Sequence, residues 1–177
     1  MKRKFVSGSN KRRYYLVAKI LHWLTAFVVA FNILSGWKLG DFALQTRQPL
    51  VNFHADVGVT IFFLMLFRWW WREHHKLFAF PGRWKRPSTL VQLIFYPLVL
   101  IQVMIGAVQA AFIDYEVIAF GFINFSAIAA DNEGLHELFL LAHGLTAGLL
   151  IVLIVLHGLE RSKKALIDDQ QFFIGPK

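Results

Sequence analysis

Four long apolar runs alternate with short polar segments along this chain of 177 residues. The runs cover residues 14–37, 51–71, 90–112 and 135–159, and each is 21 to 25 residues long. Because a helix rises about 1.5 Å per residue, about 20 apolar residues cross the roughly 30 Å hydrocarbon core of a bilayer. The pattern therefore predicts an all-α membrane protein, a bundle of four transmembrane helices.

The composition agrees with this fold class, since 56% of the residues are hydrophobic and only 17% are charged. The first run follows a basic stretch and lacks a cleavage site of small residues, so we expect a retained helix rather than a removable signal peptide. No internal repeat, low-complexity linker or separate soluble segment is visible. Residues 1–177 are expected to form a single membrane domain.

The formal net charge of +8 has a specific distribution. The cations flank the apolar runs instead of covering one polar face, so we expect no nucleic-acid partner. They gather before the first run, between the second and third, and after the fourth: Lys2, Arg3, Lys4, Lys11, Arg12, Arg13; Arg68, Arg72, Lys76, Arg83, Lys85, Arg86; Arg161, Lys163 and Lys164. The segment between the first and second runs holds only two cations, Lys38 and Arg47. The segment between the third and fourth runs holds four acids: Asp114, Glu116, Asp131 and Glu133. The positive-inside rule therefore places both termini in the cytoplasm.

Histidine is the main candidate metal ligand of this chain, which has seven histidines and no cysteine. The lack of cysteine excludes disulfides, thiolate metal sites, iron-sulfur clusters and covalently attached haem. In the fourth run His143 and His157 are fourteen residues apart, within about 40° of one helix face and about 21 Å apart along its axis. This spacing indicates axial ligands for two haems, one near each membrane surface.

Two further histidines lie at matching depths. In the predicted topology His22, early in the first run, is level with His157, and His54, early in the second, is level with His143. A b-type haem with two imidazole ligands needs one from each side of the porphyrin, and helix bundles place such ligands on facing helices. We expect two haem-binding pairs, His22 with His157 and His54 with His143.

Other interpretations of these histidines remain open. An intramembrane histidine can hydrogen-bond a neighbouring helix or line a proton path, so a haem-free transporter with a histidine relay is one alternative. His136 competes with His143, but it is 21 residues, or about 31 Å, from His157, which is too far for a core of about 30 Å. We expect His136 near the outer haem edge, and His74 and His75 in solvent.

Gly58 and Arg68 are candidate supporting residues. Gly58, one turn past His54, could let a porphyrin approach the helix backbone, or could simply permit close helix packing. Arg68 lies at the cytoplasmic end of the second run, where it could bind haem propionates or act as a snorkelling anchor.

Several motifs occur in a fixed order along the chain: His22-Trp23; His54 with Gly58 and Arg68; Phe120-Gly121; and His143-x13-His157. In this order they resemble the bacterial cytochrome b561 family over nearly the whole chain. The resemblance implies four helices that hold two b haems, with the first and fourth helices ligating the cytoplasmic haem and the second and fourth the periplasmic one. It also implies the inner membrane, ubiquinone as redox partner and, for some members, oxidation of superoxide at the outer surface.

The predicted function is transmembrane electron transfer linked to the quinone pool. Two histidine ligands fill both axial positions of a haem iron and leave no open site for oxygen activation, which is typical of an electron relay. A superoxide oxidase would need positive potential at the outer surface, whereas these outer segments are acidic overall. The alternative is a membrane-anchor subunit, similar to the cytochrome b subunits of hydrogenases and formate dehydrogenases, that passes electrons between a periplasmic dehydrogenase or c-type cytochrome and quinone.

Overall fold

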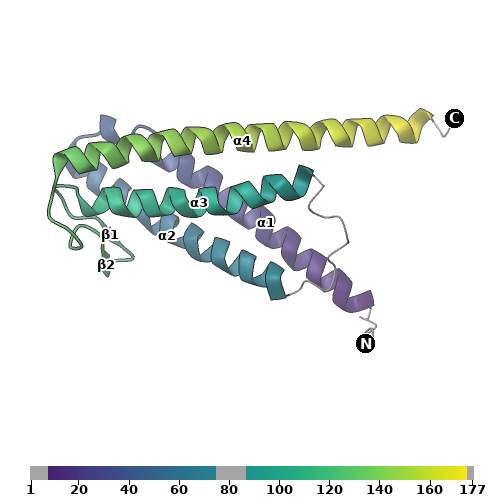
Figure 1. Ribbon diagram of the computed structural model, residues 1–177, viewed down its shortest axis with the longest axis horizontal. Coiled ribbons are helices and arrows are strands. Elements are labelled where there is room, and N and C mark those ends of the chain that lie inside the picture. The colour runs from purple at the N-terminus through teal and green to yellow at the C-terminus, as the bar shows by residue number, and fades with distance from the viewer. Residues whose placement is uncertain (1–7, 75–86, 175–177) are drawn as a thin grey trace.

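The structure, a computed structural model, describes residues 8–74 and 87–174. Its four long helices are α1 (Gly8–Gly36), α2 (Leu44–His74), α3 (Pro87–Ala111) and α4 (Glu133–Ile174). A short helix, η1 (Leu39–Asp41), joins α1 to α2, and a hairpin of β1 (Ile118–Ala119) and β2 (Ile123–Asn124) lies between α3 and α4. The hairpin and η1 lie at one end of the bundle, and both ends of the described chain lie at the other (Figure 1). We call these the hairpin end and the termini end.

Each long helix contains a stretch that is long and apolar enough to cross a membrane. This confirms the predicted fold class. The helices extend beyond the apolar runs, since α2 begins at Leu44 rather than at residue 51, and α4 continues past residue 159 to Ile174. Hydropathy marked only the membrane-spanning parts, because polar residues such as Gln45 and Lys163 are good helix formers and prolong a helix into water.

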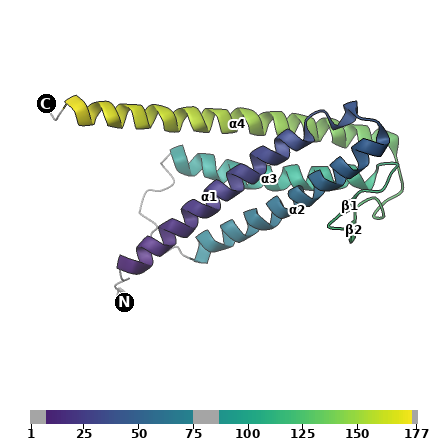
Figure 2. The ribbon, with the colours of Figure 1, turned by 180° about the vertical axis from the view of Figure 1, so that it is seen from behind.

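The bundle has its largest apolar side chains on the outside. Trp23, Phe27 and Leu145 are 65%, 70% and 66% exposed, whereas a small buried core gathers Val29, Ile61, Met65, Val99 and Leu150 from all four long helices. An exterior of this kind suits a protein whose solvent is lipid. Helix α1 packs on α2, α2 on α3 and α3 on α4, and the view from behind shows α1 beside α2 (Figure 2).

Seven of the fifteen cations that predict the orientation fall in residues 1–7 and 75–86, which lie outside the described residues. The fold does place the last turn of α2 and the first turn of α3 at the same end as both ends of the described chain, as a four-helix antiparallel bundle requires. The cytoplasmic location of that end stays a prediction.

Candidate functional site

Four histidines meet as two pairs across facing helices. The ring centroids of His54 on α2 and His143 on α4 are 6.2 Å apart, and those of His22 on α1 and His157 on α4 are 6.5 Å apart. These are the two pairs that the predicted depths indicated. Since α4 supplies one member to each, the pairs are separated by about 21 Å along this helix. We call them the hairpin-end pair and the termini-end pair.

The separation within each pair fits one metal ion between two imidazoles. With metal–nitrogen bonds of about 2.0 Å, two imidazoles on opposite sides of an ion have their centroids about 6 Å apart. Two rings in direct edge contact have a similar separation. The side chains around each pair therefore have to distinguish a metal site from a simple ring contact. Within the described residues, histidine, cysteine, aspartate and glutamate form no group of three or more that could hold a metal. Two imidazoles alone suit a haem iron, whose other four positions are filled by the porphyrin, better than a bare ion.

Small residues make room for the rings of the hairpin-end pair. A Cβ added at Gly36 would stand 2.6 Å from Cε1 of His54, and one added at Gly106 would stand 2.9 Å from Cε1 of His143. Non-bonded carbon atoms do not approach this closely, so each ring lies against helix backbone at a position that only glycine permits. A larger residue at position 36 or 106 would push the facing ring out of its present position.

A hydrogen-bonded chain also sets the protonation of His54. Ser35 Oγ lies 3.3 Å from His54 Nδ1 and 3.0 Å from the carbonyl oxygen of Asn32. The serine hydroxyl has one proton, and when it donates to the carbonyl its oxygen accepts from His54 Nδ1–H. Nε2 of His54 then keeps its lone pair for a metal, which is the usual arrangement behind a ligating histidine.

A polar clamp between α3 and α4 holds the backbone next to the second ring. Gln102 Nε2 donates to the carbonyl oxygen of His143 at 3.1 Å, and Thr146 Oγ1 bonds to Gln102 Oε1 and lies 2.8 Å from the carbonyl oxygen of Ala142. Polar side chains within a membrane span commonly join helices in this way. The clamp fixes the register of α4 against α3 at the level of His143.

The termini-end pair has a cation beside it. Arg68 Nη2 is 3.1 Å from His22 Nδ1, and its guanidinium also lies over the ring of Tyr96, 5.4 Å from the centroid. A guanidinium only donates, so Nδ1 accepts and the ring proton resides on Nε2. Ligation of a metal through Nε2 requires that this proton leave or that Arg68 turn away. An Arg68 that turns away is free to bind a carboxylate.

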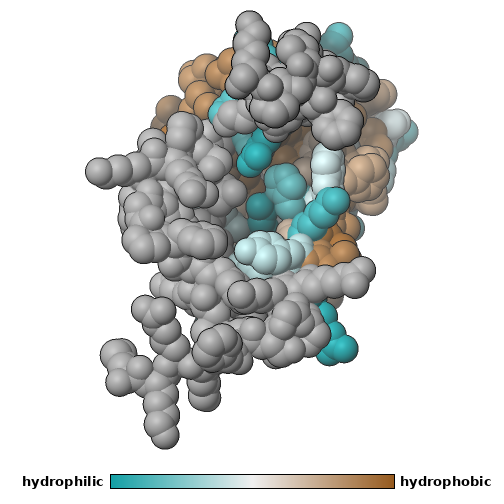
Figure 3. All heavy atoms as spheres, turned by 90° about the vertical axis from the view of Figure 1, so that its right-hand side faces the viewer, coloured by the Kyte–Doolittle hydropathy of each residue, from teal (hydrophilic) through white to brown (hydrophobic). Residues whose placement is uncertain are grey.

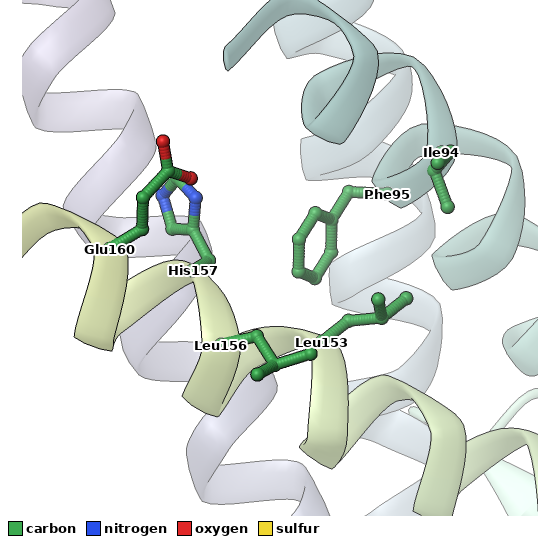
Figure 4. A pocket seen from close by; sticks show the side chains of 6 residues that line it. All are labelled: Ile94, Phe95, Leu153, Leu156, His157 and Glu160. Carbon is green, nitrogen blue, oxygen red and sulfur yellow. The ribbon is translucent and has the colours of Figure 1, made fainter. Parts of the chain in front are cut away.

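An apolar cavity of about 160 Å³ opens beside His157 between α3 and α4 (Figure 4). It is lined by Ile94, Phe95, Leu153, Leu156, His157 and Glu160. Seen from the termini end, the molecule has a hollow between the helices with hydrophilic side chains inside it (Figure 3). The cavity is smaller than a usual cofactor pocket of about 300 Å³ or more, so at most one edge of a porphyrin would fit in it.

Other candidate residues lie apart from the pairs. A Cβ at Gly58 would meet only Asn32, 3.8 Å away, so Gly58 packs against α1, and its contact with a cofactor stays a prediction. His136 Nδ1 lies 3.2 Å from the carbonyl oxygen of Gln109, so the structure brings His143, not His136, to His54. His74 is exposed, as expected, and His75 lies outside the described residues.

The mouth of the bundle at the hairpin end is acidic. A cavity of about 540 Å³ is lined by residues that include Asp114, Tyr115, Glu116 and Asp131. The guanidinium of Arg47 lies over the ring of Tyr115, 5.7 Å from the centroid. Burial raises the pKa of Tyr115, and Arg47 partly offsets this rise, so the phenol stays protonated and adds no charge of its own at pH 7.

Several residues around the pairs were not predicted from the sequence, namely Ser35, Gly36, Gln102, Gly106 and Thr146. The apolar run 90–112 contains three glutamines, Gln92, Gln102 and Gln109. Gln102 lies nearest the middle of the run, and an amide deep inside a membrane span is a signal for a role within the bundle. Glycines carry a weaker signal, because most of them in membrane helices serve only packing.

Four membrane-spanning helices around two facing histidine pairs define a membrane-embedded cytochrome b. The sequence matches the family described as prokaryotic cytochrome b561 over residues 13–167. The chain therefore belongs to the prokaryotic cytochrome b561 family, and it is a bacterial membrane protein that binds b-type haem and transfers electrons. No curated protein matches the sequence.

Proposed function

We propose that this protein holds two b haems, one at each histidine pair, and passes single electrons between the two membrane surfaces. The observation that carries the proposal is the geometry of the pairs, with centroids 6.2 and 6.5 Å apart on a shared helix. When bound, haem would supply a one-electron carrier, and the residues that would hold it are His22 with His157 and His54 with His143.

The contribution of the chain is to position the imidazoles and to exclude water. Ser35 keeps the proton of His54 on Nδ1, and Gly36 and Gly106 confine the rings. The rings of the hairpin-end pair lie against helix backbone at Gly36 and Gly106, which leaves little room for water beside them and lowers the rearrangement of solvent that electron transfer there would need. The two pairs, about 21 Å apart along α4, cover most of a hydrocarbon core of about 30 Å.

We infer that the protein lies in the inner membrane with the termini end in the cytoplasm, and that ubiquinone in the bilayer is one redox partner. The distribution of cations supports this orientation, and a membrane cytochrome b that transfers electrons requires a redox partner that it can reach from the bilayer. The apolar cavity beside His157, between α3 and α4, is the opening through which a quinone in the lipid phase would approach the termini-end pair.

The acidic cavity at the hairpin end favours a positively charged protein over superoxide as the second partner. Asp114, Glu116 and Asp131 would repel an anion and attract a basic surface. The second candidate function is therefore that of a membrane anchor that docks a periplasmic electron-transfer protein. A protein of this kind should remain with its partner during mild purification. Superoxide should reduce its haems too slowly to compete with the spontaneous dismutation of superoxide.

Haem stoichiometry tests the main proposal. We expect the purified protein to contain two haems per chain by pyridine haemochromogen assay, both low-spin and both removed by acid-acetone. One haem per chain would exclude the two-pair assignment, and the lack of a Soret band would leave the histidine relay as the explanation. Anaerobic addition of a short-chain ubiquinol to the oxidised protein in nanodiscs should reduce the haems. If it does not, quinone is not the partner.

A further inference from the structure

The hairpin between α3 and α4 runs along α2 on a ladder of polar contacts. Every fourth residue of α2 meets every second residue of the strand. The contacts are Gln48 Nε2 to the Glu116 carbonyl oxygen at 3.1 Å, the Ile118 amide to Asn52 Oδ1 at 3.1 Å, and the Phe120 amide to Asp56 Oδ1 at 2.6 Å.

The two repeats match because of the geometry of helix and strand. Four helical residues rise about 6 Å, and two strand residues rise about 6.6 Å. Asn52 and Asp56 are each about 160° around the helix from His54, so the ladder lies on the face of α2 that points away from the hairpin-end pair. Without the hairpin this polar face would be open to lipid.

The ladder places the hairpin tip at the depth of the hairpin-end pair. His54 lies midway between Asn52 and Asp56 along α2, and Asp56 bonds to the amide of Phe120 in the turn. If the two pairs are centred in a core of about 30 Å, then about 4 to 5 Å of hydrocarbon remains beyond each pair, or about three residues of helix. Asp56 and the turn that it holds are then several ångströms inside the hydrocarbon.

The sequence of the hairpin changes at this boundary. Glu116 lies beside Gln48, on the water side of the boundary, and residues 117–123 carry no polar side chain. Val117 and Ala119 are fully buried against the bundle, whereas Phe120 and Phe122 are 49% and 77% exposed, with their rings stacked 6.3 Å apart. The exposed aromatic pair is thus at a depth where lipid surrounds the protein.

The backbone of the turn is suited to an apolar medium. An unpaired amide in hydrocarbon costs several kcal/mol, so irregular backbone is tolerated there only when its polar groups are bonded. The amide of Val117 donates to Ser126 Oγ, that of Phe122 to the carbonyl oxygen of Ala119, and that of Phe120 to Asp56. Phe120 has φ 52°, a left-handed conformation that is costly for a phenylalanine. The hydrogen bond that its amide donates to Asp56 Oδ1 offsets part of that cost.

We propose that residues 120–122 form a re-entrant anchor, which inserts its two phenylalanine rings among the acyl chains of the leaflet on the hairpin side. Asp56 holds the anchor to α2 at the level of the hairpin-end pair. Lipid is the occupant because the tip is continuous with the apolar surface of the transmembrane spans, carries no charge and lies below the estimated core surface. The depth estimate uses the proposed haem positions, but the experiment below measures depth without reference to haem.

The cysteine-free chain allows the test to be made with single-cysteine variants. A nitroxide on Phe122→Cys, in phosphatidylcholine nanodiscs, should collide more with oxygen than with a water-soluble nickel chelate. Leu145→Cys, on the exposed middle of α4, gives the lipid reference, and Asp131→Cys, exposed on the same connection as the hairpin, gives the water reference. A chelate accessibility at position 122 equal to that of the water reference overturns the proposal. A label shielded from both reagents also overturns it, because the tip would then be covered by protein.

The role of Asp56 is tested in the same labelled protein. Asp56→Ala removes the acceptor of the Phe120 amide and should raise the chelate accessibility of the label several-fold, whereas Asp56→Asn keeps an oxygen acceptor and should leave it near the original value. Unchanged haem spectra of both variants show that the bundle is intact. If Asp56→Ala leaves the label as deep as before, the ladder does not hold the anchor.

Discussion

Gly106 of α3 lies directly against the ring of His143 on α4, so that a Cβ at position 106 would stand 2.9 Å from Cε1 of the imidazole. We expect Gly106→Ala to push the ring aside and to lower the occupancy of one haem several-fold. An alanine is by itself better for a helix than glycine by about 1 kcal/mol, so any loss must come from the clash. Haem per chain and the low-spin electron paramagnetic resonance signal measure the effect.

The control for this substitution lies on α4. A Cβ at Gly148 would meet nothing within 4 Å, so Gly148→Ala should keep both haems. Gly36→Ala, which crowds His54, should reproduce the effect of Gly106→Ala. Full and unchanged haem content in Gly106→Ala would show that the ring has space to move.

Removal of the proposed ligands should separate the two haems. His54→Ala and His143→Ala should each abolish or convert to high spin one haem, and His22→Ala and His157→Ala the other, because each leaves an iron with an empty axial position. The two variants of one histidine pair should have the same haem spectrum, and this spectrum should differ from that of the two variants of the other pair. His136→Ala should retain both haems, since its Nδ1 faces the carbonyl oxygen of Gln109. If His136→Ala lost a haem and His143→Ala kept both, His136 and not His143 would be the haem ligand.

Arg68 should tune one haem only. Its guanidinium is the cation beside His22, and a positive charge nearby disfavours the oxidised iron. At an effective dielectric near 20, such a charge contributes about 1 to 2 kcal/mol, so Arg68→Ala should lower one midpoint potential by some tens of millivolts. Arg68→Lys keeps the charge and should give a smaller shift. Redox titration in nanodiscs checks both, and equal shifts of the two potentials would contradict a local effect.

The clamp at Gln102 and Thr146 can be measured as a pair. Gln102→Leu and Thr146→Val each remove one side of the contact between α3 and α4, and each should destabilise the haem-loaded protein by about 1 kcal/mol. The double variant should lose less than the sum, because the second change removes an interaction that is already broken. Additive losses of thermal stability would show that the two side chains act separately.

The four helices and the spacing of the histidines could be predicted from the sequence, whereas the immediate surroundings of the histidines could not. The lengths of the apolar runs predicted the four helices. The rise of a helix per residue predicted the axial distance between His143 and His157. Both properties lie along a single helix and need no partner. The contacts of Gly36 with His54 and of Gly106 with His143 depend on how helices rotate and cross, which no single run encodes.

The polar residues of α2 illustrate the same limit. Gln48, Asn52 and Asp56 recur every four residues, which marks one helix face, but their partners are backbone groups of a hairpin about 64 to 68 residues away in sequence. Backbone amides look alike at every position, so no pattern of side chains identifies them. The depth of Arg68 is compatible with a propionate-binding role and with a snorkelling anchor, and its contact with His22 appears only in the fold.

Because one uninterrupted helix carries a histidine of each pair, its length between them should be intolerant of evolutionary change. A single residue gained or lost between His143 and His157 turns one imidazole by about 100° relative to the other and shifts it by about 1.5 Å. Homologues can therefore lengthen or shorten the connections at either end of α4, whereas an insertion or deletion within this interval would separate the two histidines of one pair instead of adjusting the distance between the pairs.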